Sequence, residues 1–313
     1  MADKIATREA YGNALAEFGD TYDFVVLDVD LAAATKTGVF KKKFPERHFD
    51  CGIAEGNMIS VAAGMAAAGL VPFASTFAMF SAGRAFEQIR NSIGYPHLNV
   101  KIGATHAGIT VGEDGATHQC LEDIATMRSI PGMAIISPAD ATEARAAVEF
   151  AINYYGPVYL RFGRMAVPVL FDRDTYQFTF GKGVLMADGS DVTIFATGVT
   201  VDFALTARQL LANEGISARV VNIHTIKPLD KEIVLRAAAE TGAIVVAEEH
   251  NIIGGLGSAV AETVCEANPV PVVRVGVEDV FGRSGKVPAL LEAYGLTPAN
   301  IAAKAKVAVS LKK

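Results

Sequence analysis

The stretch MAIISPADATEARAAVEFAINYYGPVYLRF, residues 133–162, decides the fold class. Two largely apolar runs, Met133–Ile136 and Val158–Phe162, lie on either side of a helical pattern over Ala139–Asn153. Continuous apolar runs of this length are typical of strands buried on both faces. Ser137-Pro138 and Asp140 form a typical signal for the beginning of a helix. The stretch therefore predicts a strand–helix–strand unit with two parallel strands.

The same alternation continues through both halves of the chain. Further strands of the first half are predicted at Phe24–Leu27 and Val100–Ala104. A polar, turn-rich stretch follows Gly163, and a second series then begins, with strands at Val192–Ala196, Ala218–Ile223, Ile244–Ala247 and Val270–Val277 and helices at Val201–Asn213, Lys231–Glu240, Gly257–Ala267 and Val287–Ala293. We therefore expect two three-layer α/β domains with mostly parallel sheets, residues 1–165 and 191–313, joined by a linker at 166–190.

Length and charge exclude several classes of protein. The chain has 313 residues, of which 51% are hydrophobic and 20% charged, so it is neither disordered nor collagen-like. Its 28 Lys and Arg against 34 Asp and Glu give a net charge of −6. Because the cations are not clustered, the sequence predicts no nucleic-acid partner and no anionic-membrane partner.

The segment Gly56–Gly83 has no charged residue, but its composition is wrong for a membrane span. Ala and Gly dominate it and Pro72 interrupts it, so we expect a buried helix, a turn at Ala68-Gly69 and a short strand. The N-terminus has no apolar core of the kind a signal peptide needs. Three scattered cysteines (Cys51, Cys120 and Cys265) favour a reducing compartment, and a cytoplasmic location is expected.

A glycine run in the second half of the chain and five histidines could suggest functional motifs, but structural interpretations are favoured. Gly254-Gly255-Leu256-Gly257 is followed by Val260 where a dinucleotide fingerprint needs a third Gly, so a tight turn into a helix is favoured. His224 and His250 have no catalytic partners nearby in sequence and are interpreted as structural. His97, His106 and His118 lack the spacing of a zinc site, and no metal ligand is predicted.

Three groups of residues in the first half of the chain are candidates for a catalytic or binding role. Glu55 stands at the entry of the Ala-rich helix, where an unpaired carboxylate is costly to desolvate. Phe77 and Phe80 follow, and Thr105–Gln119 is a Gly-rich loop after a strand, with two His and two acids. Each group also has a structural interpretation, as a helix-dipole charge, core aromatics or solvated loop residues. Their concentration in one predicted domain favours a site, because parallel sheets bind ligands at such loops.

Together these groups resemble motifs of the thiamine-diphosphate-dependent transketolases. The similar segments are Gly52-Ile53-Ala54-Glu55, Ser75-Thr76-Phe77-x-x-Phe80 and Gly112-Glu113-Asp114-Gly115-x-Thr117-His118-Gln119, in the order found in that family's pyrimidine-binding domain. The third is the most specific, because the β subunits of 2-oxoacid dehydrogenases share only the Glu and the general fold. Ile226-Lys227-Pro228-Leu229-Asp230 is similar to the family's C-terminal domain. The resemblance implies a pyrimidine-binding domain over 1–165 and a transketolase C-terminal domain over 191–313.

The resemblance also implies a cofactor, thiamine diphosphate, and the residues that hold it. Glu55 is implied to hydrogen-bond a nitrogen of the aminopyrimidine ring and so to let the cofactor deprotonate its own thiazolium carbon. Phe77 and Phe80 are implied to stack on the pyrimidine, and Asp30 to lie near the thiazolium. The apolar setting suits Glu55, because a carboxyl group kept neutral by desolvation can donate this hydrogen bond.

The implied activity is transfer of a two-carbon ketol unit from a ketose phosphate to an aldose phosphate, as in pentose phosphate metabolism. His118 matches a proton-handling His, and Asp114 matches a residue that reads the configuration of a substrate hydroxyl. Arg8, His106 and Arg164 match a site for the distal phosphate of the sugar.

Two positions depart from the family pattern. Gly83 stands where many members have a third aromatic, and Ala34 where many have a phosphate-binding Ser. These departures predict a wider pocket and leave the preferred sugar phosphate open.

One motif of full-length members is missing. No Gly-Asp-Gly, which helps to hold Mg²⁺ or Ca²⁺ in the family's diphosphate domain, occurs in the chain. The chain therefore resembles the C-terminal subunit of a split transketolase, active only with an N-terminal subunit that binds the metal, in an α2β2 complex. The apolar Gly56–Gly83 segment also predicts self-association. The alternatives are a deoxyxylulose-phosphate synthase-like or 2-oxoacid dehydrogenase β-like enzyme, and a non-catalytic stabilising subunit.

Overall fold

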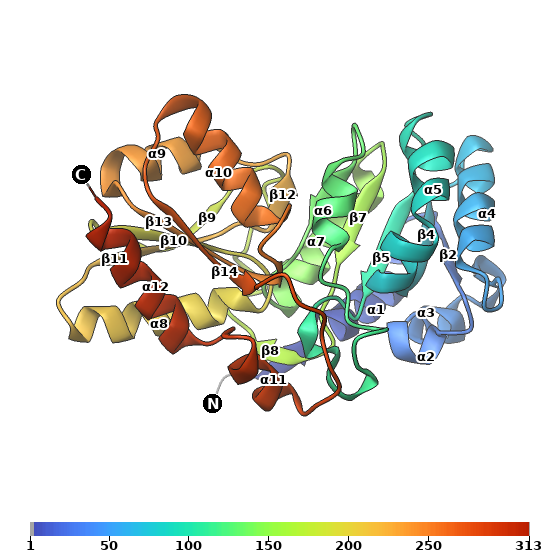
Figure 1. Cartoon of the computed structure of the whole chain (residues 1–313). Coiled ribbons are helices and arrows are strands. Elements are labelled where there is room, and N and C mark those ends of the chain that lie inside the picture. The colour runs from blue at the N-terminus through green and yellow to red at the C-terminus, as the bar shows by residue number, and fades with distance from the viewer. Residues whose placement is uncertain (1–2, 313) are drawn as a thin grey trace.

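The computed structural model describes residues 3–312 and contains two α/β domains, which lie side by side in Figure 1. The larger sheet has seven strands in the order β12-β6-β7-β5-β4-β2-β3. Its strands are β2 (Val25–Asp28), β3 (His48–Asp50), β4 (Pro72–Phe77), β5 (Lys101–Thr105), β6 (Ala134–Ile136), β7 (Val158–Arg161) and β12 (Thr225–Lys227). Every neighbouring pair is parallel except β12 and β6, which are antiparallel.

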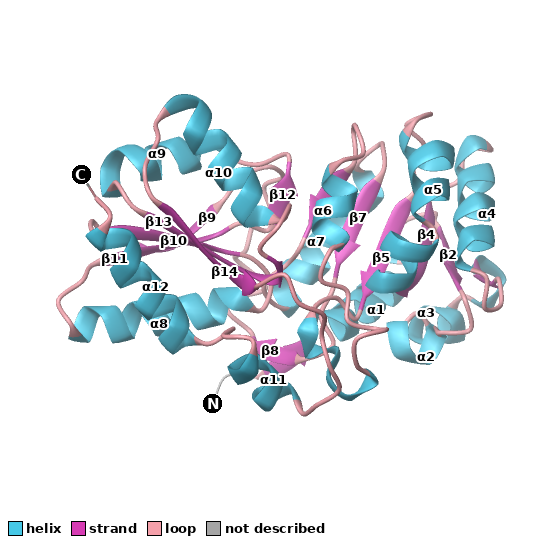
Figure 2. Cartoon of the chain, in the orientation of Figure 1, coloured by secondary structure: helices cyan, strands magenta, loops and turns pink. Residues whose placement is uncertain are grey.

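Helices cover both faces of this sheet, which explains why its inner strands are buried along their whole length (Figure 2). One face packs against α1 (Thr7–Phe18), α3 (Gly38–Lys43) and α7 (Ala141–Asn153). The other face packs against α4 (Glu55–Ala67) and α6 (Asp123–Arg128). The shorter helical elements are α2 (Ala32–Thr35), α5 (Phe86–Gln88), the 3-10 helices η1 (Pro45–Arg47) and η4 (Ile109–Asp114), and the π-helices η2 (Phe80–Arg84) and η3 (Ile89–Gly94).

The smaller sheet has five strands in the order β14-β13-β10-β11-β9. These are β9 (Val184–Ala187), β10 (Val192–Ala196), β11 (Ala218–Asn222), β13 (Ile244–Asn251) and β14 (Val272–Val277). One face packs against α8 (Thr200–Asn213) and α12 (Pro298–Ser310), and the other against α9 (Lys231–Thr241) and α10 (Leu256–Ala267). The helix α11 (Val287–Ala293) instead packs against η4 of the first domain.

The predicted fold class, two α/β domains with mostly parallel sheets, is confirmed. The uncharged segment forms α4 and then β4, as expected from its composition. The glycine run before α10 is a turn, and the Glu248 carboxylate accepts hydrogen bonds from the N–H groups of Leu256 and Gly257 there. None of the helices within residues 3–312 combines the length and the apolar character that crossing a membrane requires.

The predicted linker at 166–190 contains two strands that sequence patterning missed. β8 (Ala166–Pro168) pairs antiparallel with β1 (Lys4–Ala6), and β9 is the antiparallel edge strand of the smaller sheet. β12, from the second half of the chain, closes the edge of the larger sheet. The strands β8 and β12 have three residues each and contain no apolar run long enough to identify a strand. β9 is apolar, but it lies within the polar, turn-rich stretch that suggested a linker.

The two domains share buried polar contacts. The Arg161 guanidinium lies 2.8 Å and 3.2 Å from the two carboxylate oxygens of Asp123 and donates a further hydrogen bond, of 2.9 Å, to the backbone carbonyl of Glu249. Both members of the ion pair are buried. Asn222 Nδ2 of the second domain also donates to the buried Glu143 carboxyl group of α7, at 2.9 Å. These contacts join the domains through groups that cannot be left unpaired without cost.

We expect Asp123→Ala to lower the free energy of unfolding by about 3–5 kcal/mol, because it leaves the buried Arg161 cation without its carboxylate. The measurement is equilibrium unfolding in urea. Glu262→Ala is the matched control: it removes the exposed partner of Arg128, in an ion pair that also joins the two domains, and should cost about 1 kcal/mol or less. Equal losses for the two variants would contradict the assignment of Asp123 as the charge on which Arg161 depends.

Candidate active site

Five of the predicted site residues follow the carboxyl ends of neighbouring strands of the larger sheet. Asp30 follows β2, Phe77 ends β4, His106 follows β5 and Arg164 follows β7, while Glu55 begins α4 after β3. The strands run in the order β7-β5-β4-β2-β3, so parallel pairing brings these residues to one edge. This edge is where parallel α/β sheets bind ligands.

An aromatic group forms the centre of this edge. The rings of Phe77 and Phe80 are stacked, with centroids 5.5 Å apart and an interplanar angle of 15°. The His106 ring stacks on Phe77 at 3.8 Å, and the His118 ring lies edge-on to Phe80 at 5.3 Å. Thr117 Oγ1 lies 2.9 Å from His118 Nδ1, which leaves the other ring nitrogen available. Sequence positions as far apart as 77 and 118 are thus brought into one wall.

Glu55 lies beside this wall and is nearly inaccessible to solvent, with 2% of its side chain exposed. Its carboxylate oxygens lie 3.2 Å and 3.3 Å from Nη1 of Arg84. Arg84 comes from η2, is 60% exposed, and also lies over the ring of Phe80, 5.2 Å from its centroid. The carboxyl group is therefore buried, while its cationic partner is open to solvent.

A cationic group lies on the other side of Phe77. Arg8 Nη1 lies 3.0 Å from His106 Nε2 and also donates to the backbone carbonyl of Ala34. Arg164 Nη1 lies 3.3 Å from Asp114 Oδ2 and donates to the Val111 carbonyl. Burial, together with the positive charges of Arg8 and Arg164, lowers the pKa of His106 to about 3. The His106 ring is therefore neutral, and the positive charge of this group resides on the two arginines.

Asp30 stands apart from the other predicted site residues. It is exposed and has a positive φ of 61°, and its N–H donates to Asp50 Oδ1 at 2.9 Å. Aspartate tolerates this left-handed conformation better than most residues. The structure places Asp30 at the same edge of the sheet, and its proximity to a thiazolium ring stays a prediction.

Two family models match the chain. The transketolase pyrimidine-binding domain matches residues 3–169, and the transketolase C-terminal domain matches residues 181–301. The putative transketolase C-terminal section of Methanocaldococcus jannaschii is 49% identical over 298 residues, which cover 94% of this chain and 93% of that protein. The chain belongs to the transketolase family.

Two further relatives are similar over nearly their whole length. The 6-deoxy-6-sulfo-D-fructose transketolase subunit of Clostridium sp. (strain MSTE9) is 46% identical over 295 residues, covering 94% of this chain and 91% of that protein. A solved structure of a split-gene transketolase, an inactive beta4 tetramer, is 54% identical with a TM-score of 0.92 and covers 99% of this chain and 100% of its own. This transketolase-family chain therefore resembles split transketolase subunits over nearly their whole length.

The flexible end of Met79 lies beside Gly83, one of the two departures from the transketolase pattern. A Cβ atom added at Gly83 would lie 2.4 Å from Cε of Met79. Because a methionine side chain is flexible, it can move away from this position. The wider pocket expected from Gly83 therefore stays a prediction.

Sequence reasoning assigned no role to two residues that contact the predicted transketolase site. Arg84 follows Phe80 by four residues, which is one helical turn and places both on the same side of Glu55; this spacing was the available signal. Glu249 reaches the backbone of the site loop from the second domain, 139 residues away, and no local pattern marks it.

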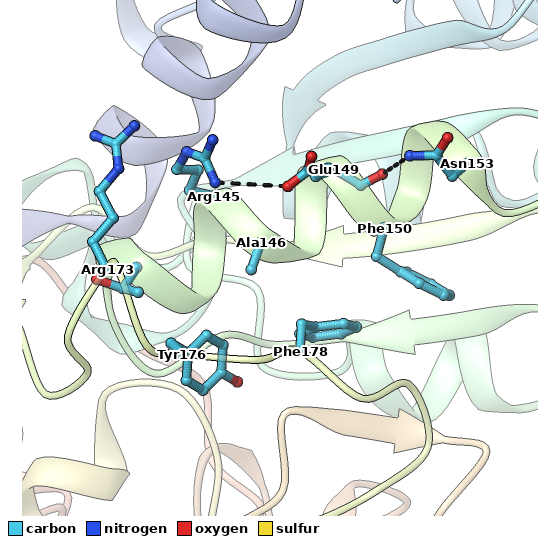
Figure 3. Close-up of a pocket in the computed structure, with 9 residues that line it drawn as sticks. Arg145, Ala146, Glu149, Phe150, Asn153, Arg173, Tyr176 and Phe178 are labelled. Carbon is cyan, nitrogen blue, oxygen red and sulfur yellow. Dashed lines mark hydrogen bonds and ion pairs between the residues drawn. The ribbon is translucent and has the colours of Figure 1, made fainter.

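Two hollows on the surface have different relations to the site. One, of about 590 Å³, is lined by Met79, Thr117 and Phe281 among others, and Thr117 contacts the predicted site residue His118. The other, of about 360 Å³, lies against α7 (Figure 3). Neither is lined by a predicted site residue, whereas a smaller hollow of about 230 Å³ is lined by Arg164. Both arginines of the hollow against α7 are paired, Arg145 with Glu17 and Glu149 and Arg173 with Glu17, so neither offers a free positive charge to a ligand.

The structure offers no metal site on the part of the chain that it describes. Across residues 3–312, no three His, Cys, Asp or Glu side chains come together in a group that could hold a metal ion. The site consists instead of one buried carboxyl group, an aromatic wall and an arginine pair.

We expect the His106 ring to stay neutral from pH 8 down to pH 5, because its pKa is about 3. Since the unfolded chain binds this proton near pH 6.5, stability falls as the pH falls from about 6.5 toward 3. The measurement is NMR of the imidazole C–H resonances, which should not shift between pH 5 and 8. A titration of His106 near pH 6.5 would contradict the neutral, buried ring. The variant Arg8→Met should raise the pKa of His106, because it removes a nearby positive charge.

Proposed function

We propose that this chain is the C-terminal subunit of a thiamine-diphosphate-dependent transketolase that transfers a two-carbon ketol unit from a ketose phosphate to an aldose phosphate. The observation that supports it most is the nearly inaccessible Glu55 carboxyl group beside the stacked rings of Phe77 and Phe80. A buried carboxyl group next to an aromatic surface suits an aminopyrimidine, whose ring nitrogen would share the carboxyl group with its present partner, Arg84.

The side chains present fit the pyrimidine half of thiamine diphosphate. When bound, the cofactor supplies the nucleophilic carbon that carries the two-carbon unit. Glu55 would hold a proton at a ring nitrogen, and Phe77 and Phe80 would fix the plane of the ring. Asp30 would lie near the thiazolium. These residues would orient the cofactor and transfer protons. Neither role requires this chain to bind the diphosphate.

The remaining site residues suit a sugar phosphate. Arg8 and Arg164 would bind the distal phosphate with His106, since guanidinium groups bind oxyanions well. Asp114, paired with Arg164, would contact a substrate hydroxyl. His118 is half-buried and has one ring nitrogen held by Thr117, so its other nitrogen would transfer a proton.

The relative named for 6-deoxy-6-sulfo-D-fructose favours a second candidate substrate class. A sulfonate is a tetrahedral oxyanion like a phosphate, and the same arginine pair would bind either. We propose to distinguish them with the reconstituted complex, by comparing xylulose 5-phosphate with 6-deoxy-6-sulfo-D-fructose as donor. The donor with the higher kcat/KM identifies the terminal group for which the site is built.

A separate subunit would supply the diphosphate half of the site. The charged diphosphate needs a cation and fixed donors, and we propose that an N-terminal subunit holds Mg²⁺ or Ca²⁺ in an α2β2 complex. The C-terminal section from M. jannaschii and the split-gene transketolase, an inactive beta4 tetramer, support a separate partner subunit. The three cysteines are unpaired, which supports a reducing compartment such as the cytoplasm.

The purified chain alone should bind thiamine diphosphate weakly in the presence of Mg²⁺ and should not transfer ketol units. Calorimetric titration of the chain, before and after addition of the N-terminal subunit, measures this directly. Micromolar binding and ketol transfer by the chain alone would contradict the split site. Binding and turnover that appear only with both subunits are the expected result.

In the reconstituted complex, Glu55→Gln should lower kcat by about 10³-fold, within the 10²–10⁴ range of a central acid–base contact, because an amide cannot exchange a proton as a carboxyl does. The matched control is Glu87→Gln, since Glu87 is exposed and contacts only its helix neighbours Gln88 and Asn91. Near-normal turnover of the Glu55 variant, with the fold unchanged by circular dichroism, would contradict the role of Glu55.

A further inference from the structure

The loop that carries the predicted substrate residues has little regular structure of its own. Between His106 and His118 it forms only the 3-10 element η4, and Gly108, Gly112 and Gly115 all have positive φ. Glycine adopts these conformations easily but loses much conformational freedom when it is held in one of them. The position of the loop must therefore be fixed by contacts from outside it.

Glu249 of the second domain provides a buried contact of this kind. It lies in β13, and its Oε1 accepts a hydrogen bond of 2.7 Å from the backbone N–H of Thr110. The carboxyl group also lies against Gly108: a Cβ atom at that position would be 2.2 Å from Cδ of Glu249. Glu249 is held in turn by Arg161, which donates to its backbone carbonyl.

This contact lies one residue from the predicted substrate group. The carbonyl of Val111, the next residue after Thr110, accepts a hydrogen bond from Arg164. Arg164 is also paired with Asp114, four residues after Thr110. A shift of the Thr110 backbone would therefore displace the acceptor that orients Arg164 and the carboxylate that pairs with it.

The second domain also holds the far end of the loop. Gln119 Nε2 donates to the Arg283 carbonyl at 3.0 Å, and to the carbonyls of Ile109 and Gly112 at 3.2 Å each. Lys286 forms an ion pair with Glu113 at the surface. The loop is thus contacted from the second domain at both ends, but only Glu249 does so with a buried charged group.

Stability alone is a poor reason for a carboxyl group at this position. Burial raises the pKa of the Glu249 carboxyl, because the charged form loses its hydration. An uncharged acceptor of similar size would avoid this desolvation cost and would still accept the N–H of Thr110. What a carboxyl oxygen provides and an apolar side chain cannot is a fixed acceptor for the N–H of Thr110.

We propose that Glu249 is a positioning residue of the C-terminal domain, which fixes the backbone at Thr110 and thereby places Arg164 and Asp114 for the substrate. The effect on substrate binding rests on the proposed function. The effect on the loop rests only on contacts within this chain.

The test compares two uncharged variants of similar size in the purified chain, Glu249→Met and Glu249→Gln. Only Gln retains an acceptor oxygen, so the Met variant should exchange the Thr110 amide hydrogen about tenfold or more faster, while the Gln variant stays close to the wild type. The measurement is site-resolved hydrogen–deuterium exchange. Glu262→Met, which removes a domain-crossing ion pair that does not touch the loop, is the control and should leave Thr110 unchanged.

Equal exchange at Thr110 in the Met variant and the wild type would overturn the proposal. If the Met variant does not fold, the wild-type chain itself decides: its Thr110 amide should be protected as strongly as buried amides of β13, and rapid exchange there would overturn the proposal. Strong protection supports it.

In the reconstituted complex, Glu249→Met should raise KM for a phosphorylated donor about tenfold with a smaller change in kcat, and Glu249→Gln should restore KM. A residue that only stabilises the fold would lower the melting temperature without moving KM, which would overturn the positioning role. Absence of ketol transfer from the wild-type complex would count against the proposed function, while the exchange experiment would still decide the role of Glu249 in the loop.

Discussion

The buried Arg161 guanidinium is the contact on which the arrangement of the two domains and of the site loop depends. It lies at the end of β7, is neutralised by Asp123 from α6, and donates to the Glu249 carbonyl of the second domain. A cation in such a place is tolerated only when its charge and its donors are satisfied. Satisfying them fixes β7, α6 and β13 relative to one another. The Glu249 side chain then reaches Thr110 in the site loop.

In the candidate site, opposite charges lie close together but differ in their exposure to solvent. Glu55 is buried while its partner Arg84 is open to solvent. Where His106 stacks on Phe77, burial and the charges of two arginines lower the pKa of His106 and leave that ring neutral. Glu55 and Arg84 thus lie at the Phe80 end of the aromatic wall, and Arg8 lies at the end where His106 stacks on Phe77.

The division of chemistry proposed between two subunits agrees with what this chain contains. Its residues suit an aminopyrimidine and a sugar oxyanion, whereas residues 3–312 include no group of side chains suited to a metal ion. Such a division makes the active site a property of the complex. The C-terminal domain also has a role at the site, since it contacts the site loop through Glu249, Arg283 and Lys286.

The sequence by itself determined the two α/β domains, because inner strands must be apolar and helices must cover them, and both patterns can be seen locally. It also led to the residues of the candidate site, because they stand in short motifs that follow the predicted strands. Only the tertiary structure decided that β8, β9 and β12 pair at sheet edges, that Met79 lies beside Gly83, and that Glu249 supports Thr110. β8 and β12 are too short to show a pattern, and β9 is apolar but lies within a turn-rich stretch. Contacts between distant positions depend on packing, which leaves no periodic signal in the chain.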